Sequence, residues 1–231
     1  MTPDVAVLIP ALDAAATLPG LLEELHAHVG ELPVLVVDDG SRDDTAQLAR
    51  HGGAECFQHL SPQGKGAALR RGWDLLFRRG HGAVLCLDAD GQHNPADAPA
   101  MLDLWRREKP DLIIGDRDLR HAAMAWDRRL SNRLSTRILS LRSGLPLSDS
   151  QCGYRLLAFS LWERLQPNGR AFDLESEVLL QAGSLGARVC QIPVVQRPSG
   201  AGSHVKRMRD TGRFLRLLLG PTRLEGSKTG E

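Results

Sequence analysis

Apolar and polar residues are grouped in blocks along the first half of the chain, and the blocks predict a repeated order of strand and helix. Continuous apolar runs at residues 5–9, 33–37 and 83–87 are typical of strands buried on both faces of a parallel sheet. Between these runs, apolar residues recur with helical spacing, and a further short strand is expected near Cys56 and Phe57. The alternation predicts an α/β fold with a mostly parallel central sheet flanked by helices.

The second half of the chain is less regular but still contains recognisable elements. We expect a strand at 111–115, an amphipathic helix at 127–142 and a short helix at 172–182. Residues 149–155 are polar and surround a glycine, which predicts a loop with a pivot. A proline interrupts the strand expected at 187–195, so this strand should lie at an edge of the sheet or contain a bulge.

The helix expected at 127–142 has an apolar face and a separate row of arginines. Such a row is typical of a solvated face, but it would also suit an interfacial helix that faces anionic lipid or phosphate. A second basic, amphipathic stretch follows at 205–219. The apolar face consists of Leu130, Leu134, Ile138 and Leu141. The row of arginines consists of Arg129, Arg133 and Arg137.

Composition narrows the class of protein. The 231 residues suffice for a single domain, expected at 1–220, with a disordered tail at 221–231. The net charge of +1 argues against a protein that binds nucleic acid through bulk positive charge. The four cysteines lie far apart without C-x-x-C spacing, so neither a zinc site nor a disulfide framework is indicated. With no signal peptide and no spanning apolar run, we expect a cytoplasmic protein, soluble or peripheral at the inner membrane face.

Carboxylates follow predicted strands at what should be one edge of the sheet. Asp88 and Asp90 follow one strand, Asp38 and Asp39 end another, and residues 10–13 follow the first. Because the carboxyl ends of parallel strands open onto the ligand crevice, these groups can hold a cation or a polar ligand. Carboxylate oxygens favour Mg²⁺ or Mn²⁺, and Mg²⁺ usually combines one or two of them with substrate phosphates. The pattern favours a site for a nucleoside diphosphate.

Each acidic pair also has a plainer interpretation. Asp88 and Asp90 could form an acidic turn before a helix that Asn94 and Pro95 cap. Asp38 and Asp39 could belong to the cap of the next helix, where Ser41 and Asp44 resemble a capping box. Asp38 and Asp39 could also accept hydrogen bonds from a base or ribose. Lys65, between two glycines, could approach a diphosphate, with a plain turn as the alternative.

Two other motifs share an acidic core with the pair at Asp88. An EF-hand loop starting there would need glycine at its sixth position and glutamate at its twelfth, where the chain has His93 and Pro99, so that motif is excluded. A phosphatase-type D-x-D-x-T motif would need threonine in place of Gln92 and is a weak alternative.

Short motifs mark the predicted strand ends and continue into the second half of the chain. They are Ile9-Pro10-Ala11, Val36-Val37-Asp38-Asp39-Gly40-Ser41 with Thr45, Gly64-Lys65-Gly66-Ala67-Ala68-Leu69, Leu87-Asp88-Ala89-Asp90-Gly91-Gln92-His93, Gly115-Asp116-Arg117, Asp149-x-Gln151-Cys152-Gly153-Tyr154-Arg155, Phe172-x-x-Glu175-x-Glu177 and Ser203-His204. In this order they resemble the family 2 glycosyltransferases with the Rossmann-like GT-A fold. Within that family, the chain most resembles bacterial relatives of polyprenyl-phosphate mannosyl- and glucosyltransferases.

The resemblance implies roles for the matching residues. Nucleotide-binding residues are expected at Pro10, Asp13, Asp38, Asp39, Lys65 and Asp88. A divalent cation, Mg²⁺ or Mn²⁺, would be held by Asp88, Asp90 and Gln92. Catalytic roles are expected for Asp90, Arg117 and Asp149. Contacts with the acceptor or with phosphate are expected at Arg129, Arg133, Arg155, Ser203 and His204.

The resemblance further implies a single displacement that inverts the anomeric centre of a sugar carried by a nucleoside diphosphate. If the acceptor is a polyprenyl phosphate, its oxygen is already ionised and no general base is needed. If the acceptor is a hydroxyl of a saccharide, a base is needed, and Asp149 is expected there, with Glu175 or Glu177 behind it. A nucleotide-sugar-binding protein without turnover is the remaining alternative.

The first motif departs from the pattern Ile-Pro-Ala-Tyr-Asn-Glu of many relatives. Here Leu12, Asp13 and Ala14 follow Ala11, so the stacking aromatic and the acid of that motif are displaced or missing. Base recognition therefore does not follow from the resemblance. The transmembrane helices of many relatives are also absent, so access to a lipid acceptor would depend on the basic amphipathic stretches or on a membrane-protein partner.

Overall fold

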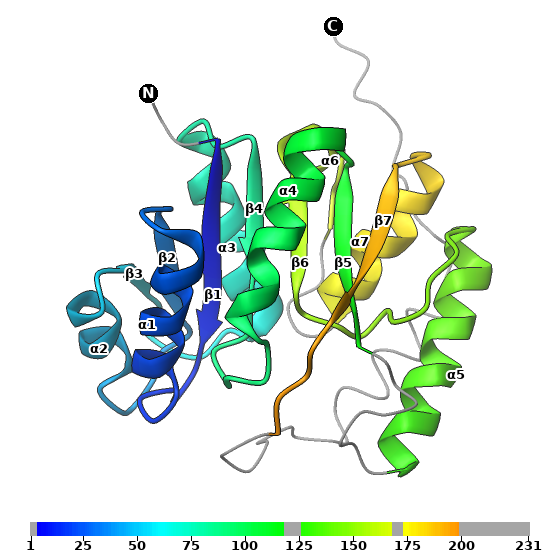
Figure 1. The fold of residues 1–231 in the computed structure, drawn as a ribbon. Coiled ribbons are helices and arrows are strands. Elements are labelled where there is room, and N and C mark those ends of the chain that lie inside the picture. Colours follow the sequence, from blue (N-terminus) through cyan, green and yellow to red (C-terminus); the bar gives the residue numbers. More distant parts are fainter. Residues whose placement is uncertain (1–3, 118–125, 168–172, 199–231) are drawn as a thin grey trace, which may run out of the picture.

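The computed structural model describes residues 4–117, 126–167 and 173–198 of the chain. These residues form one seven-stranded sheet with the strand order β3-β2-β1-β4-β6-β5-β7 (Figure 1). The strands are β1 Val5–Ala11, β2 Val34–Asp38, β3 Glu55–Gln58, β4 Ala83–Cys86, β5 Leu112–Arg117, β6 Arg155–Ala158 and β7 Val189–Val194.

All strand pairs are parallel except the two that β6 makes. β6 runs antiparallel to both of its neighbours, β4 and β5, so the predicted mostly parallel α/β sheet is confirmed. The sequence did not predict β6, because four residues are too few to show a period. β7 contains Pro193 and lies at the edge of the sheet, as predicted, since an edge strand tolerates a missing N–H.

Helices cover both faces of the sheet. In Figure 1, α1 and α4 lie on the near face, and α3 and α7 lie on the far face. α5 lies beyond β7 and packs against α7. The helices are α1 Leu18–Val29, α2 Thr45–His51, α3 Lys65–Arg78, η1 Pro95–Asp97, α4 Ala98–Glu108, α5 Trp126–Ser143, α6 Phe159–Trp162 and α7 Asp173–Ser184.

Strand direction brings the polar motifs to one edge of the sheet. The carboxyl ends of β1, β2, β4 and β5 meet at the lower edge in Figure 1. Because β6 runs the other way, its first residue, Arg155, reaches the same edge and pairs with Cys86 of β4. The acidic stretches at 38–39 and 88–90 therefore lie on the same edge as the loop that leads into β6.

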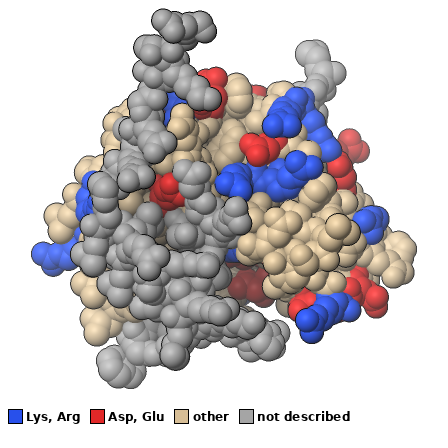
Figure 2. Space-filling model, turned by 180° about the vertical axis from the view of Figure 1, so that it is seen from behind, with Lys and Arg blue, Asp and Glu red and all other residues tan. Residues whose placement is uncertain are grey.

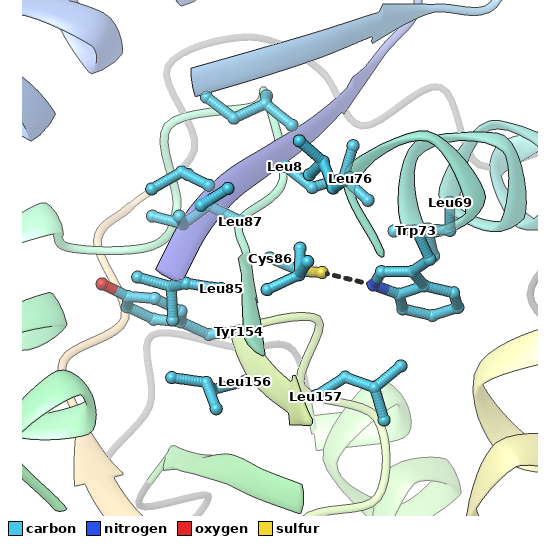
Figure 3. Close-up of a cluster of buried hydrophobic side chains, with 14 of the residues drawn as sticks. Leu8, Leu69, Trp73, Leu76, Leu85, Cys86, Leu87, Tyr154, Leu156 and Leu157 are labelled. Carbon is cyan, nitrogen blue, oxygen red and sulfur yellow. Dashed lines mark hydrogen bonds between the residues drawn. The ribbon is translucent and has the colours of Figure 1, made fainter. Parts of the chain in front are cut away.

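A sulfur-centred hydrogen bond ties α3 to the centre of the sheet (Figure 3). Trp73 of α3 donates its Nε1–H to Sγ of Cys86 at 3.1 Å, among fully buried leucines that include Leu8 and Leu85. Burial raises the pKa of the Cys86 thiol to about 12, so the thiol stays protonated at neutral pH and acts as a core residue. All four cysteines lie within the described residues and are free thiols there.

Charged side chains on the far face are mixed in sign. In Figure 2, Lys and Arg side chains lie beside Asp and Glu side chains on the part of that face that is described. Arg79, the residue after α3, forms a two-point ion pair with Glu55 of β3, with both N–O distances at 2.6 Å. Opposite charges therefore largely compensate one another there.

α5 exposes the apolar face that the sequence predicted. Leu130, Leu134 and Leu141 are 61%, 59% and 77% exposed. The helix instead buries Thr136 and Leu139, which lie on its side toward the rest of the protein. The predicted amphipathic helix is therefore present, but these three leucines of its predicted apolar face point outward, whereas the fourth member, Ile138, is partly buried beside Leu139. Within the described residues, no helix is long and apolar enough to cross a membrane.

The helix caps only partly follow the sequence. Asn94 caps η1, since its side chain accepts a hydrogen bond from the Ala96 N–H, as predicted. The capping box predicted from Ser41 and Asp44 is wrong, because α2 begins at Thr45 without a side-chain cap. The hydroxyl of Ser41 bonds to Asp38 instead.

The contact between α5 and α7 depends on Gly183. A methyl group at this position would lie 1.9 Å from the carbonyl oxygen of Ser143, so α7 approaches α5 as only glycine allows. We expect Gly183→Ala to lower the free energy of unfolding by about 1–3 kcal/mol through overpacking. Gly20→Ala is the control, because its methyl group would meet nothing within 4 Å and should stabilise α1 by about 0.5–1 kcal/mol. Urea unfolding of both variants measures the difference, and equal stability would contradict the close contact.

Candidate active site

Lys65 joins two carboxylates at the sheet edge. Its Nζ lies 2.7 Å from Oδ1 of Asp88 and 3.3 Å from Oε2 of Glu175. The ring of His93 approaches the other oxygen of Asp88 at 3.5 Å. These side chains come from the start of α3, the loop after β4 and the start of α7. The structure therefore brings together Lys65 and Asp88, predicted to bind the nucleotide, and Glu175, predicted as an alternative base, and adds His93 to them.

The charges of this cluster stabilise one another. Burial alone would raise the pKa of Asp88, but Lys65 and the His93 ring hold it well below its usual range. Burial would likewise lower the pKa of Lys65, whereas Asp88 and Glu175 raise it above its usual range. The ammonium and the Asp88 carboxylate therefore stay ionised at neutral pH.

Gly153 lets the loop before β6 approach Asp88. A side-chain carbon at this position would lie 2.6 Å from Oδ2 of Asp88. The glycine predicted to be a pivot is therefore required because of a close approach between the loop and the carboxylate. The loop around it is also more buried than its polar sequence suggested, since Asp149, Ser150 and Cys152 are inside.

Asp90 and Gln92 lie on the loop after β4. Asp90 is exposed, and its Oδ1 accepts a hydrogen bond from the Gln92 N–H at 3.0 Å. The side-chain oxygen of Gln92 accepts a bond from Nε2 of Gln196 at 2.9 Å, so the structure does not direct it toward Asp90 as a third ligand. The described residues hold no group of three or more His, Cys, Asp or Glu side chains arranged for a metal. The donors that fit Mg²⁺ or Mn²⁺ are thus the carboxylate of Asp90 and, beside Lys65, that of Asp88.

The buried carboxylate of Asp38 has one oxygen without a partner. Asp38 is completely buried, and its Oδ1 accepts bonds from the N–H and hydroxyl of Ser41. Its Oδ2 has no hydrogen-bond partner among the described residues. A buried acceptor left unpaired costs about 1–3 kcal/mol, so this oxygen is suited to receive an N–H or O–H of a ligand.

Asp39 has a different role from Asp38. Its Oδ1 lies 2.7 Å from Nδ1 of His59 and accepts the N–H of Gln63, while its Oδ2 accepts the N–H of Gly64 at 2.7 Å. Both oxygens are therefore engaged with the segment that precedes α3. The structure uses Asp39, predicted to contact the nucleotide, to fix the position of Lys65.

The loops after β1 and β2 are joined through Asp13. Asp13 adopts a left-handed backbone conformation with φ of 50°, its N–H donates to the Ser41 hydroxyl, and its Oδ1 accepts the Arg42 N–H at 2.8 Å. Asp13, predicted to bind nucleotide, is thus a link between loops. Pro10 is buried in β1 opposite Val37, and Leu12 is half exposed at the strand end.

Arg117 and Asp149, both predicted to be catalytic, bind each other. Nε and Nη2 of Arg117 donate to the two oxygens of Asp149 at 2.6 and 3.1 Å, and Asp149 also accepts the Gln151 N–H. Burial would lower the pKa of Arg117, but Asp149 raises it above its usual range. Both side chains are buried, so the pair fixes the loop before β6 to the end of β5.

Arg155 is also a structural brace. Its guanidinium donates to the carbonyl oxygens of Ser150, Cys152 and Glu175 at 2.7, 2.7 and 3.0 Å. The structure therefore does not present Arg155 as the predicted phosphate clamp. Sequence gave no signal for this role, because the three carbonyls come from two distant segments.

The remaining predicted acceptor residues are less central. Arg133 is exposed on α5 and lines a shallow pocket of about 300 Å³ with Arg137 and Leu141, whereas Arg129 is partly buried on the same helix. Ser203 and His204 lie outside the described residues. Residues that the sequence did not single out are Gln196 and Arg197, which contact the loop after β4.

Known proteins share this sequence pattern and fold. The profile described as Glycosyl transferase family 2 matches residues 6–165. The chain is 32% identical over 216 residues to the glycosyltransferase AglJ of Haloferax volcanii, covering 91% of this chain and 70% of that protein. It is 30% identical over 212 residues to the undecaprenyl-phosphate mannosyltransferase of Micrococcus luteus, covering 85% of each.

A solved structure supports the same fold. Glucosyl-3-phosphoglycerate synthase from Mycobacterium tuberculosis, in complex with Mn²⁺, UDP and glucosyl-3-phosphoglycerate, matches with a TM-score of 0.70 at 20% identity. The match covers 92% of this chain and 76% of that chain. The predicted GT-A fold is thereby confirmed. The chain is a glycosyltransferase and belongs to glycosyl transferase family 2.

Proposed function

We propose that this glycosyltransferase moves a sugar, with inversion, from a nucleoside-diphosphate sugar to a polyprenyl phosphate at the cytoplasmic membrane face, with the help of Mg²⁺ or Mn²⁺. The observation that carries the proposal is the edge of the sheet where Asp38 has a buried oxygen without a partner in the described part of the chain and where Asp88 and Asp90 offer carboxylates. The relative from Micrococcus luteus is named an undecaprenyl-phosphate mannosyltransferase, which supports the acceptor class.

The donor is proposed to lie across the ends of β1, β2 and β4. Oδ2 of Asp38 would accept a hydrogen bond from an N–H on the base, and the diphosphate would extend toward Asp90. A divalent cation there would offset the charge that develops on the departing nucleotide. Asp90 is the residue best placed to hold it, because its carboxylate is exposed and only one of its oxygens has a bond from Gln92.

An acceptor that is already an anion suits this site. A phosphate oxygen needs no general base, and the carboxylate predicted as a base for a hydroxyl acceptor, Asp149, has both oxygens bonded to Arg117. The second candidate function is transfer to a saccharide hydroxyl. Glu175 favours it, since this carboxylate lies in the charged cluster at the sheet edge and would be the base.

Membrane contact is proposed to occur through α5. Three leucines of this helix point outward, and Arg133 and Arg137 line a shallow pocket beside Leu141. Leucines inserted at the acyl boundary, with arginines at the level of the headgroups, are typical of an interfacial helix on anionic lipid.

Substitution of Asp90 tests the donor site. We expect Asp90→Asn to lower sugar transfer by on the order of 100-fold or more, because a carboxylate that holds the cation on the leaving group is lost. The assay follows nucleotide release with a panel of donors, prenyl phosphate and Mn²⁺. Asp103→Asn on α4, an exposed aspartate paired with Arg106, is the control. Near-normal transfer by Asp90→Asn would refute the metal assignment, and binding of donors without any transfer by the wild type would favour a non-catalytic protein.

Substitutions in the buried pair of Arg117 and Asp149 test whether Asp149 is a general base or a structural residue. We expect Asp149→Asn to lower the free energy of unfolding by about 3 kcal/mol or more, since it leaves Arg117 buried without its charge partner. Transfer to prenyl phosphate, measured well below the melting temperature, should fall by less than the roughly 10²–10⁴-fold that a general base supplies. Arg117→Gln should cost similar stability, and the double variant should cost less than the sum. A catalytic loss in the range of a base without a loss of stability would reverse the assignment.

Vesicle sedimentation tests α5. We expect the wild type to sediment with vesicles of phosphatidylglycerol and phosphatidylcholine, less so as salt rises, because screening weakens the contribution of the arginines. The double variant Leu134→Ser, Leu141→Ser should sediment less. Leu60→Ser, at a fully exposed leucine near β3, is the matched control. Equal sedimentation of both variants, or binding that salt does not change, would count against α5 as the membrane surface.

A further inference from the structure

A segment after β7 runs beside the loop that carries Asp90. Val195 donates its N–H to Oδ2 of Asp97, and Gln196 forms an antiparallel bridge with His93. Arg197 then donates its N–H to the carbonyl oxygen of Gln92 at 2.9 Å. Residues 195–197, here called the strap, are thus paired along the backbone with a segment about a hundred positions earlier in the chain.

Two strap side chains reinforce this pairing. Nε2 of Gln196 donates to Oε1 of Gln92 at 2.9 Å. The guanidinium of Arg197 donates to Oδ1 of Asn94 at 2.7 Å and to Oε2 of Glu24, on α1, at 2.6 Å. Arg197 therefore connects the loop after β4 to α1 as well as to the strap.

The loop is held at its other end by α1 too. The Thr17 hydroxyl, at the start of α1, donates to the carbonyl oxygen of Ala89 at 2.6 Å. Asp90 therefore lies between a fixed residue on its N-terminal side and the strap contacts at Gln92 and Asn94 on its C-terminal side. Both ends of the short segment around Asp90 are anchored.

The strap acts on Asp90 through Gln92. Oδ1 of Asp90 accepts the N–H of Gln92, and the strap grips Gln92 by both its carbonyl oxygen and its side-chain oxygen. Because the strap fixes Gln92, it also fixes the direction of the Gln92 N–H and of the Asp90 carboxylate that accepts it. This arrangement has the form of an outer layer that orients a carboxylate ligand.

We propose that Arg197 and Gln196 are positioning residues that orient Asp90 for a cation-bound diphosphate. The proposal rests on the role of Asp90 given above. The Arg197–Glu24 pair is itself exposed, with side chains 38% and 45% accessible, so it adds little to global stability. Its effect is therefore local and separable from folding.

The experiment compares Arg197→Gln with Arg188→Gln. Arg188 lies next to the first residue of β7 and forms an exposed pair with Glu108, so it is the same kind of contact at the opposite end of the strand. Binding of UDP and of GDP is measured by calorimetry with and without Mn²⁺. Hydrogen exchange of the amides of residues 89–94 and the melting temperature are measured on the same proteins.

We expect Arg197→Gln to weaken Mn²⁺-dependent nucleotide binding by about 10–100-fold, the range seen when a partner of a metal ligand is removed. Exchange at residues 89–94 should become faster, while the melting temperature and nucleotide binding without Mn²⁺ stay unchanged. Arg188→Gln should match the wild type in every measurement. Arg197→Lys should fall between, because one ammonium can reach Glu24 but lacks the fork that also reaches Asn94.

Two results would overturn the proposal: wild-type exchange at residues 89–94 in Arg197→Gln, or an equal loss in Arg188→Gln. If the wild type binds neither nucleotide more tightly with Mn²⁺, the proposed function fails. In that case hydrogen exchange still decides whether the strap fixes the loop.

Discussion

The ion pair between Lys65 and Asp88 is the contact on which the candidate site depends. Burial raises the pKa of the Asp88 carboxylate, and the positive charge of Lys65, 2.7 Å away, lowers it below its usual range. The ammonium is placed by Asp39, whose oxygens fix the N–H groups of Gln63 and Gly64 just before α3 begins. The buried aspartate that follows β2, Asp39, thus fixes the position of the ammonium that pairs with Asp88.

Several charged residues at this edge support the site instead of facing a ligand. Arg117 and Asp149 neutralise each other, and Arg155 donates hydrogen bonds to three backbone carbonyl oxygens of the surrounding segments. Polar groups in a region with little water need such partners, because each unpaired one costs free energy. The contrast with Asp38 is therefore informative, because one of its buried oxygens has no partner in the part of the chain that the structure describes.

The sequence predicted most of the fold and the correct edge of the sheet, but not the division of roles at that edge. Apolar runs identify strands because a strand that is buried on both faces has apolar residues at nearly every position. β6 is too short to show such a run. The exposed leucines of α5 show that helical periodicity identifies an apolar face but does not tell whether that face points to the core or to solvent. Whether an arginine holds a phosphate or a carbonyl depends on residues distant in sequence, as for Arg155 and Glu175. The contacts of the strap could not be predicted for the same reason, because its partners also lie far away in the sequence.

The antiparallel strand β6 ends a long excursion of the chain away from the sheet. The chain leaves the sheet at Arg117 and returns at Arg155, and β5 and β6 are neighbours, so the 37 intervening residues start and end close together. The ion pair of Arg117 and Asp149 closes the base of this excursion. An insertion whose ends meet, clamped at its base, can change in length and sequence without altering the strand order.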